Sequence, residues 1–585
     1  MLHLRFFSVF VFFLLAIFFR TLDASERPNV ILIMSDDQGY GDFGATGNTA
    51  IKTPNIDAMA SRSASMKTFY VSPVCSPTRA NLMTGRYNFR TRCIDTWLGR
   101  SMLEPDEVTV AEVLQEAGYA TGIFGKWHLG DCYPMRAIDQ GFEEALIHRG
   151  GGLAQPSEPR ENRRRYTNPV LFRNGKQVLT AGFCTDVYFD AGLEFIEKSQ
   201  AEGRNFFVYL PTNAPHGPFH DVPEDLRKEY LREKESLLKL LVSKPRDTEA
   251  AADKLSRIAA MITNIDDNVG RLFKRLDEMQ LTENTLVIFL VDNGPNGQRY
   301  VGDFRGSKSN VHEGGIRSPL WLHWPKRFKP GTARNELSAH IDLMPTILDA
   351  CNVGVPARLE LDGRSLLPLL ENKGTQWKER TITIQAHRGD KPVKFHNFMI
   401  RDSRWKLLHA SGFGRESFSG EPKFELYDLH ADPGESNNLS ASHSSEVDRL
   451  KSAYLDWFND VSSTRPNNYA PPRIHIGTPH EEVTVLTRQD WRGGTWATRS
   501  GGYWLVQVTQ PRKYIFDIEF SELSSDAVVM LDVAGITREM KVAKGASSCT
   551  ISGFEVPAGD CKLEVRISEN GKTFGAYQVA VSPSK

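Results

Sequence analysis

The fold of this chain is decided by a short apolar stretch near its start, Asn29-Val30-Ile31-Leu32-Ile33-Met34, which Asp36-Asp37-Gln38-Gly39 follows. A continuous aliphatic and β-branched run of this length is typical of a strand buried on both faces of a parallel sheet. Three further apolar runs also end in polar residues. They are Ala120–Phe124 before Gly125-Lys126-Trp127-His128, Phe206–Leu210 before Ala214-Pro215-His216, and Thr285–Val291 before Asp292-Asn293-Gly294.

Helical patterns separate these runs. Thr53 and Pro54 form an N-cap and first-turn pair that predicts a helix to Arg62, and Gly118 ends an amphipathic helix over Val108–Ala117. A long helix is expected over 248–279, because its apolar residues recur at helical spacing. Alternating strands and helices predict a mostly parallel sheet with helices on both faces. Ligands of such sheets bind beyond the carboxyl ends of the strands, so the four polar clusters are expected to meet there.

The pattern changes twice along the chain. We expect an α/β body over 26–379, with polar insertions at 150–180 and 222–250 that form loops or short helices around the site. A smaller α+β subdomain is expected over 380–469. Pro471-Pro472 then opens a linker, helical periodicity largely disappears, and short strands predict an added β-sandwich domain over 470–585.

Composition narrows the class of protein. The 585 residues carry a formal net charge of -1, which gives no indication of binding to nucleic acid or to an anionic membrane. Residues 1–25 resemble a secretory signal, with Arg5 before the uncharged run Phe6–Phe19, so a secreted or periplasmic protein with no membrane span in its mature form is expected. A retained N-terminal anchor is the alternative.

Export permits disulfides, but seven cysteines over this length do not make a disulfide scaffold. Cys549 and Cys561 flank a short β-rich stretch and are candidates for a cross-strand bridge. The spacing of the remaining cysteines does not suggest a thiolate metal site, and most of them are expected to be small buried residues.

The most informative segment for function is Cys75-Ser76-Pro77-Thr78-Arg79, extended by Ala80-Asn81-Leu82-Met83-Thr84-Gly85-Arg86. Pro77 suits the first turn of a helix with Ser76 as its N-cap, which leaves Cys75 just outside and facing solvent. A side chain there faces free backbone N–H groups that favour an anion, and Arg79 lies about one turn further on. The alternative is a buried cysteine before an ordinary capped helix.

The polar residues after two of the strands suggest a metal site. Asp36, Asp37, Asp292 and Asn293 offer only oxygen donors, which Ca²⁺ or Mg²⁺ prefers, whereas Zn²⁺ favours histidine or cysteine. Carboxylates gathered without a cation would repel one another, and at least one would tend to stay protonated. An Asp-Asp pair after a strand can also be a simple turn or helix cap.

Other polar residues are suited to binding an oxyanion. Lys126 and His128 are two residues apart, so on an extended segment they point to the same side. His216 follows a turn at Ala214-Pro215, and Lys308 lies shortly before Glu313-Gly314-Gly315-Ile316-Arg317.

Taken together and in this order, these motifs resemble those of type I sulfatases, the arylsulfatase family of formylglycine-dependent enzymes in the alkaline phosphatase superfamily. The resemblance also includes Thr53-Pro54-Asn55-Ile56-Asp57 and Glu425-Leu426-Tyr427-Asp428-Leu429, and it covers about residues 27–440. It implies an alkaline-phosphatase-like core over 26–379, completed by 380–469. It does not cover the β-sandwich with the same strength.

The resemblance also implies a mechanism of sulfate ester hydrolysis. Cys75 would be oxidised by a formylglycine-generating maturation enzyme and hydrated to a gem-diol, whose metal-held oxygen attacks sulfur. The metal, Ca²⁺ in preference to Mg²⁺, would be bound by Asp36, Asp37, Cys75, Asp292 and Asn293. Arg79, Lys126 and Lys308 would neutralise the sulfate, His128 would take a proton from the diol, and His216 would bind sulfate or assist the leaving oxygen. A further hydrogen-bonding residue of the family, downstream of the Lys-x-His segment, has no clear counterpart.

Two rival functions are left open at this point. The first is a phosphate or phosphonate ester hydrolase of the same superfamily, and the second is a non-catalytic carbohydrate-binding protein whose β tail recognises the sugar. An exported sulfatase with an added β domain favours sulfated carbohydrates over other substrates only by analogy. Trp97, Tyr133, Arg149 and His387 are candidates for contacts with a sugar or aryl group.

Overall fold

The computed structural model describes residues 27–372, 377–465 and 471–584. The expected export signal over 1–25 lies outside these ranges. Within them, no helix is both long enough and apolar enough to span a bilayer.

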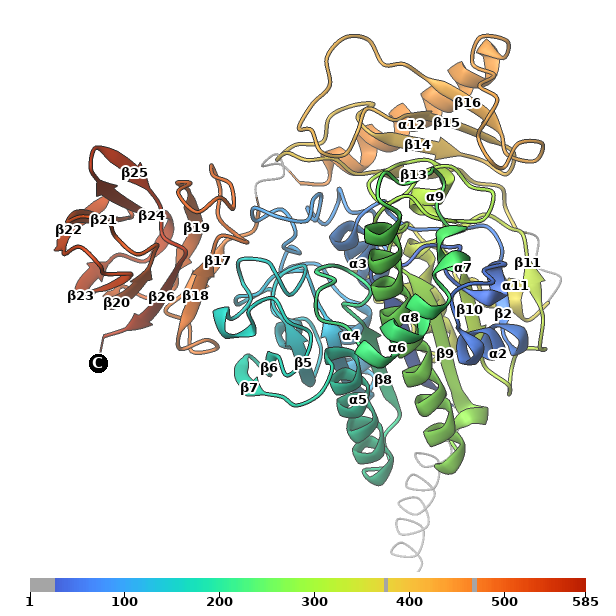
Figure 1. The fold of residues 1–585 in the computed structure, drawn as a ribbon, viewed down its shortest axis with the longest axis horizontal. Coiled ribbons are helices and arrows are strands. Elements are labelled where there is room, and N and C mark those ends of the chain that lie inside the picture. Colours follow the sequence, from blue (N-terminus) through green and yellow to red (C-terminus); the bar gives the residue numbers. More distant parts are fainter. Residues whose placement is uncertain (1–26, 373–376, 466–470, 585) are drawn as a thin grey trace, which may run out of the picture.

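A ten-stranded sheet forms the centre of the body (Figure 1), and its five middle strands run parallel to one another. In spatial order the strands are β11 (Ala333–Arg334), β2 (Ala64–Met66), β10 (Leu320–His323), β9 (Thr285–Val291), β1 (Asn29–Ser35), β8 (Phe206–Pro211), β4 (Ala120–Lys126), β5 (Glu144–His148), β6 (Val170–Arg173) and β7 (Lys176–Leu179). The predicted parallel α/β sheet is therefore confirmed.

Strand β1 shows why the middle strands are apolar throughout. Val30, Leu32 and Met34 belong to the core on one face, whereas Ile31 and Ile33 belong to the core on the other. Successive side chains of a strand point to opposite faces, so a strand covered by helices on both sides needs an apolar residue at every position.

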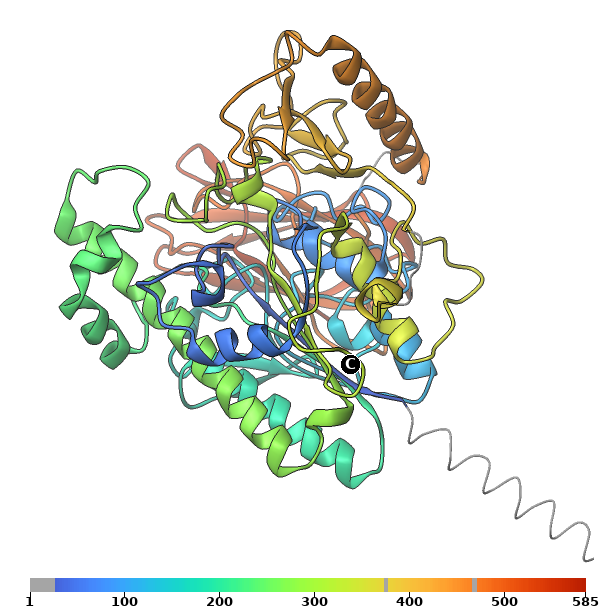
Figure 2. The same cartoon turned by 90° about the vertical axis from the view of Figure 1, so that its right-hand side faces the viewer.

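Helices cover both faces of this sheet (Figure 2). The face that carries Ile31 and Ile33 packs against α2 (Pro54–Arg62), α5 (Cys184–Ala201) and α8 (Thr248–Glu278). The face that carries Val30, Leu32 and Met34 packs against α3 (Cys75–Thr84), α4 (Val110–Glu116), α10 (Leu343–Ala350) and α11 (Leu367–Leu370). The long helix predicted over 248–279 is α8, and all seven of its periodic apolar residues are buried. They are Leu255, Ile258, Ile262, Ile265, Val269, Leu272 and Leu276.

The insertions differ from expectation in one place. The segment 222–250 forms the short helices α6 (Glu224–Arg232) and α7 (Lys234–Leu238), as expected. The segment 150–180, expected as loops or short helices, instead ends in the hairpin of β6 and β7, which extends the central sheet. An antiparallel hairpin needs only a tight turn, and Asn174-Gly175 supplies it with both residues at positive φ.

A second sheet lies beyond the body. Its four antiparallel strands are β13 (Ile382–Gln385), β14 (Phe398–Arg401), β15 (Trp405–His409) and β16 (Glu425–Asp428), and α12 (Ser444–Ser463) packs on them. Two short strands, β3 (Phe69–Tyr70) and β12 (Ser338–Ala339), pair in parallel, and α9 (Glu313–Ile316) precedes β10. The four-stranded sheet and α12 form the smaller α+β part that the sequence predicts over 380–469.

The tail consists of two packed sheets. One contains β17 (Ile474–Ile476), β19 (Tyr503–Val508), β24 (Gly559–Glu569), β21 (Ala527–Val533) and β22 (Ile536–Val542), with β25 (Lys572–Phe574) beside β24. The other contains β18 (Thr484–Thr487), β26 (Gln578–Pro583), β20 (Arg512–Glu519) and β23 (Ser548–Val556). The added β-sandwich is thus present, while the domain boundaries themselves stay a prediction.

The predicted Cys549–Cys561 bridge is wrong. Both thiols are free, because Cys549 lies on β23 and Cys561 on β24, which belong to different sheets. The other five cysteines are free and buried, and for Cys93, Cys132, Cys184 and Cys351 this is what was expected of small core residues.

The tail shares its core with the body. Leu98, Met102, Cys132 and Met135 of the body belong to the same buried cluster as Trp504 and Phe516 of the tail. At the rim of this contact, Asp390 lies between Arg100 of the body and Arg492 of the tail and forms an ion pair with each.

Candidate active site

The polar clusters after the strands converge at the carboxyl edge of the central sheet, as predicted. Strands β1 and β9 end in register, and the backbone N–H of Asp292 donates to the carbonyl of Ser35. The N–H of Asp36 donates to the carbonyl of Ala214, which ties the segment after β8 to the same edge. These backbone contacts bring Asp36, Asp37, Asp292 and His216 to one place.

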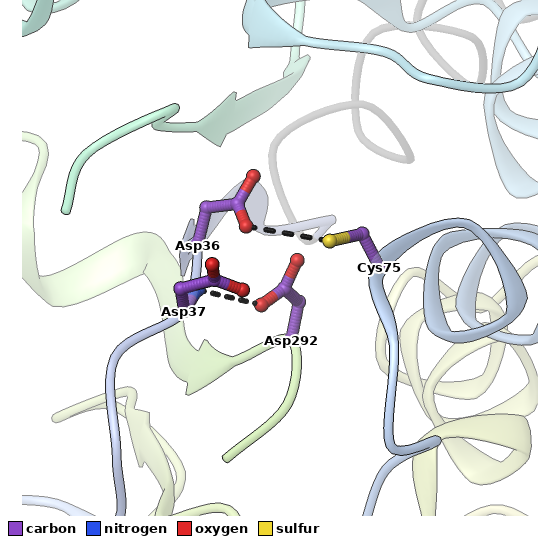
Figure 3. A group of neighbouring side chains, drawn as sticks. All are labelled: Asp36, Asp37, Cys75 and Asp292. Atoms are coloured by element: carbon purple, nitrogen blue, oxygen red, sulfur yellow. Dashed lines mark hydrogen bonds between the residues drawn. The ribbon is translucent and has the colours of Figure 1, made fainter. Parts of the chain in front are cut away.

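Three carboxylates and one thiol form the centre of the site (Figure 3). One ligand atom from each of Asp36, Asp37, Cys75 and Asp292 lies within 4.8 Å of all the others, and all four residues are buried. The Cys75 thiol donates to Asp36 Oδ1 at 3.5 Å. The Asp37 backbone N–H donates to Asp292 Oδ1 at 3.0 Å.

Helix α3 carries Cys75, but its start differs from the prediction. The helix begins at Cys75 with Val74 as its N-cap, so Ser76 is not the cap and Cys75 is not outside the helix. Nor does Cys75 face bulk solvent, since only 2% of its surface is exposed. The cause is the packing of all ten residues of α3, including a bond from Thr78 Oγ1 to the carbonyl of Asp292 at 2.7 Å.

Burial makes Cys75 a poor nucleophile in its thiol form. Removal from water, and then the charge of Asp36, raise the pKa of the thiol far above its ordinary value. The thiolate is the reactive form of cysteine, so this residue is not poised for ordinary thiolate catalysis.

The acidic cluster fits a hard divalent cation. Asp36, Asp37, Asp292 and Asn293 supply only oxygen ligands. Among the described residues, Asp37 Oδ2 and Asn293 Oδ1 are buried without a hydrogen-bond partner. Burial and the charge of Asp36 raise the pKa of Asp292 to about 7, which is the partial protonation expected of crowded carboxylates without a cation.

Three cations surround the carboxylates. Lys126 pairs with Asp36, Arg79 lies 3.0 Å from Asp292 Oδ2, and Lys308 lies 2.5 Å from Asp37 Oδ1. Burial acts to raise the pKa of Asp36, but Lys126, His216 and Arg79 outweigh it and hold that pKa well below its ordinary value. Lys308 Nζ also lies 3.5 Å from Cys75 Sγ, so one of these cations reaches the cysteine directly.

A glycine orients Lys126. Gly125, the residue before it on β4, has a φ of +142°, and a Cβ at that position would lie 2.0 Å from the carbonyl oxygen of Pro211 on β8. Only glycine fits this close approach of two strands, which directs the next side chain toward Asp36.

His128 does not lie on an extended segment, so the strand alternation from which its orientation was predicted does not apply here. Its φ is +58°, which turns the ring toward Thr96, whose carbonyl lies 3.0 Å from Nε2. A carbonyl can only accept, so the proton of the neutral ring is on Nε2 and Nδ1 keeps its lone pair. Burial, Lys126 and Arg79 hold the pKa of His128 well below 6.5.

His216 faces the carboxylates from the other side. Its Nδ1 donates to the carbonyl of Gly217 at 2.7 Å, which leaves Nε2 turned toward Asp37 Oδ2 at 3.6 Å. Burial lowers the pKa of this ring, although Asp37 acts in the opposite direction. Both histidines thus hold an unprotonated ring nitrogen at neutral pH.

A pocket of about 540 Å³ opens above Cys75. Cys75, His128, His216 and Lys308 line it, whereas Arg79, Lys126 and the carboxylates lie behind them. Its other walls are Val74, Thr96, Trp97, Gly151, Gln155, Ser309, Arg388, Phe413, Gly414 and Trp496.

Several of these wall residues are missing from the sequence prediction. Of the four expected sugar or aryl contacts, only Trp97 lines the pocket; Tyr133 stacks on His480, Arg149 packs on Phe172, and His387 is buried beside His396.

Gln155 is a polar side chain downstream of His128 that reaches the pocket, and it accepts from the N–H of Gly151 at 2.7 Å. In the sequence, the only indication of this role is the position of Gln155 shortly after three consecutive glycines, Gly150–Gly152.

The parallel sheet gathers buried carboxylates, cations and the Cys75 motif at its carboxyl edge, an arrangement suited to the hydrolysis of an ester. Residues 28–353 match the model of the sulfatase family, and residues 305–455 match the C-terminal region of N-sulphoglucosamine sulphohydrolase. The chain belongs to the sulfatase family, and it is a sulfuric ester hydrolase.

Individual relatives agree with this assignment. N-acetylgalactosamine-6-sulfatase of Canis lupus familiaris is 31% identical over 73% of this chain and 84% of its own length. Arylsulfatase A of Homo sapiens is 29% identical over 72% of this chain and 84% of its own. The solved structure of Ps i-CgsB with k-i-k-neocarrahexaose has a TM-score of 0.63 at 26% identity, covering 76% of this chain and 94% of that one. The expected alkaline-phosphatase-like fold is confirmed by this likeness.

Proposed function

We propose that this sulfatase removes sulfate groups from carbohydrates, with Cys75 converted to formylglycine and a Ca²⁺ ion beside it. The observation that carries the proposal is the position of Cys75, which forms the floor of a 540 Å³ pocket while its thiol contacts both Asp36 and Lys308. An aldehyde at this position, once hydrated, supplies a hydroxyl nucleophile that the buried thiol cannot provide.

Asp36, Asp37, Cys75, Asp292 and Asn293 are the residues that would hold the cation. Their two unpartnered oxygens, on Asp37 and Asn293, support this role. Ca²⁺ tolerates an irregular set of oxygen ligands better than Mg²⁺ does, and it is therefore the preferred ion. When bound, it supplies a positive charge that polarises the sulfate and favours the ionised form of the nucleophile.

The other side chains of the site have separate roles in the reaction. Arg79, Lys126 and Lys308 hold the sulfate oxygens and offset the charge that grows on them during transfer. His128 accepts a proton at Nδ1, because Thr96 fixes the other ring nitrogen as a donor. His216 binds sulfate or assists the leaving oxygen through Nε2, which already faces the cluster.

Relatives of this chain support a carbohydrate as the substrate. The canine relative is named for a sulfated amino sugar, and the similar solved structure holds a hexaose of the carrageenan type. In this chain the pocket is walled by Trp97 and Trp496, whose ring centroids are 5.2 Å apart in an edge-on arrangement. Aromatic faces and polar side chains together are suited to a sugar.

Maturation and export complete the proposal. A formylglycine-generating enzyme would modify Cys75, and the signal over 1–25 would direct the protein to the periplasm or the exterior. Mass spectrometry of the tryptic peptide Thr68–Arg79, from protein made in its native host, tests the modification. Finding only unmodified Cys75 would contradict it.

The reaction itself is tested by comparing p-nitrophenyl sulfate with p-nitrophenyl phosphate, with Ca²⁺ present and the maturation enzyme co-expressed. We expect a clear preference for the sulfate. Preference for the phosphate would assign the chain to phosphoester chemistry and leave the fold and the acidic cluster unaffected.

A further inference from the structure

A second pocket, of about 410 Å³, adjoins the one above Cys75. One wall is the segment 153–164 of the body, and the other consists of Arg488, Trp496, Tyr577 and Gln578 of the tail. Gln155 and Trp496 line both pockets, so the two cavities share a border. A chain-like ligand that leaves the Cys75 pocket across this border enters the second one.

Four arginines make the second pocket basic: Arg160, Arg163, Arg164 and Arg488. Arg160 has only a long ion pair to Glu519, at 3.8 Å. Arg163 and Arg164 form no ion pair with a described carboxylate, and both side chains are exposed. The one acidic residue of the lining, Glu158, accepts a hydrogen bond from Asn162 and lies 3.3 Å from His148, so it is engaged on its own side.

Arg488 is the most unusual of the four. It is only 1% exposed, yet within the described part of the chain its guanidinium donates solely to backbone carbonyls, those of Gly575, Ala576, Ala497 and Thr498. Burial lowers its pKa to about 10, which still leaves it charged at neutral pH. A buried cation without a carboxylate favours an anion nearby, because charge in a low-dielectric region needs a partner.

Two of the arginines lie on a strained turn that its surroundings hold in place. Arg163 and Arg164 have φ values of +46° and +62°, a conformation that residues with a side chain rarely adopt. Asn162 fixes this turn, since its Oδ1 accepts from Val170 N at 2.6 Å and its Nδ2 donates to Val170 O at 3.0 Å. Such strain persists where the surrounding structure enforces it, and it is concentrated at functional sites.

We propose that the second pocket binds an anionic group, sulfate or carboxylate, on a sugar next to the one from which sulfate is cleaved. This inference rests on the proposed function and adds that the substrate is a polyanionic oligosaccharide. It also gives the tail a role, because the tail supplies Arg488, Trp496 and Tyr577 to the binding surface.

The test is calorimetric binding of a heparin-derived hexasaccharide, which is dense in sulfate and carboxylate, to the full chain carrying Cys75→Ala. Adding Arg163→Ala and Arg164→Ala should weaken binding about tenfold or more, because two charge-assisted contacts are lost. The matched control adds Lys244→Ala and Arg246→Ala, which remove two exposed cations that line neither pocket and should leave the affinity within twofold.

Equal affinity with and without the two arginines would overturn the proposal, and so would a parent protein that does not bind the hexasaccharide. A fully desulfated probe identifies the anionic group that the pocket binds. If the arginine substitutions still weaken binding of this probe, the group is a carboxylate; if they no longer do, the group is a sulfate. Failure of the proposed function is separate, because it appears as absent hydrolysis of p-nitrophenyl sulfate by the enzyme with an intact Cys75.

Discussion

The three cations next to Cys75 each lie against a carboxylate, whereas three of the arginines around the neighbouring pocket, Arg163, Arg164 and Arg488, have none among the described residues. Lys126 and Arg79 are wholly buried, and their partners offset the cost of removing them from water. Arg163 and Arg164 are instead exposed to solvent, and Arg488 donates hydrogen bonds to backbone carbonyls.

This difference in charge pairing suggests different roles for the two regions: catalysis in the inner site and ligand binding in the outer pocket. Each cation of the inner site has a carboxylate partner that fixes its side chain, and stabilising a transition state requires such preset positions. The outer pocket keeps an excess of positive charge, which attracts a polyanion without fixing where it reacts. Four experiments test how far the two regions are independent.

The largest effect should follow from Cys75→Ala. We expect turnover of p-nitrophenyl sulfate to fall about 10⁴-fold or more, since the nucleophile is removed, while a cooperative thermal transition remains. Activity and melting are measured on the same preparation. Cys351→Ala, which removes another buried thiol that belongs neither to the cluster nor to the pocket lining, is the control and should keep its turnover. Loss of the cooperative transition in Cys75→Ala would mean that this residue serves the fold.

The next effect concerns His128. His128→Gln should lower turnover by about 10²–10⁴-fold, the usual contribution of a general base. A base must be unprotonated, and the pKa of His128 is held well below 6.5, so in the parent enzyme protonation of this ring reduces the rate only below pH 6.5. The measurement is the pH profile of kcat/KM at saturating Ca²⁺.

The exposed His220 supplies the control for this experiment, since His220→Gln should leave both rate and profile unchanged. A parent enzyme whose activity already halves between pH 8 and 7 at saturating Ca²⁺ would argue against His128 as the base.

A smaller change is expected from Asp37→Ala. It removes a carboxylate that offers an unpartnered oxygen to the cation and leaves Lys308 without its partner. Calorimetry should show Ca²⁺ binding weakened about 100-fold. Asp95→Asn, a buried carboxylate outside the cluster that pairs with Arg388, should bind Ca²⁺ like the parent. Unchanged affinity in Asp37→Ala would exclude this residue from the metal centre.

The smallest effect on activity is expected from a substitution at the border between the two pockets. Trp496→Ala removes a wall shared by both, so KM for p-nitrophenyl sulfate should rise about three- to tenfold with kcat within twofold. Steady-state kinetics on the parent and variant measure this, with the half-buried Trp405→Ala as a control outside both pockets. A large fall in kcat would show that the tail acts on the inner site as well.

Sequence reasoning succeeded where local pattern and position in the fold agree. The apolar runs before Asp36 and Asp292 predicted two strands, and the carboxyl-edge rule then predicted that their polar ends meet; in the structure the two strands are neighbours. Cys75 was found by its motif. Local pattern did not reveal how Cys75 is buried, because the covering residues come from distant segments.

Other features depend on contacts that linear pattern does not contain. The turn at His128 breaks the strand alternation on which its predicted orientation rested, and a positive φ at histidine has no reliable sequence signal. Trp496 and Arg488 reach the pockets only because the tail packs on the body. Cys549 and Cys561 are near in sequence, yet they lie on different sheets.

The core that the tail shares with the body has a thermodynamic consequence. If the two parts separated, Leu98, Met102 and Met135 would lose cover from the tail, at about 1.5–3 kcal/mol for each side chain fully exposed. A cost of that size couples the two parts into one cooperative unit, so a calorimetric scan of the full chain should show a single transition. In evolutionary terms the tail is not a detachable module: a lineage that lost it would have to rebuild the surface of the body beneath it.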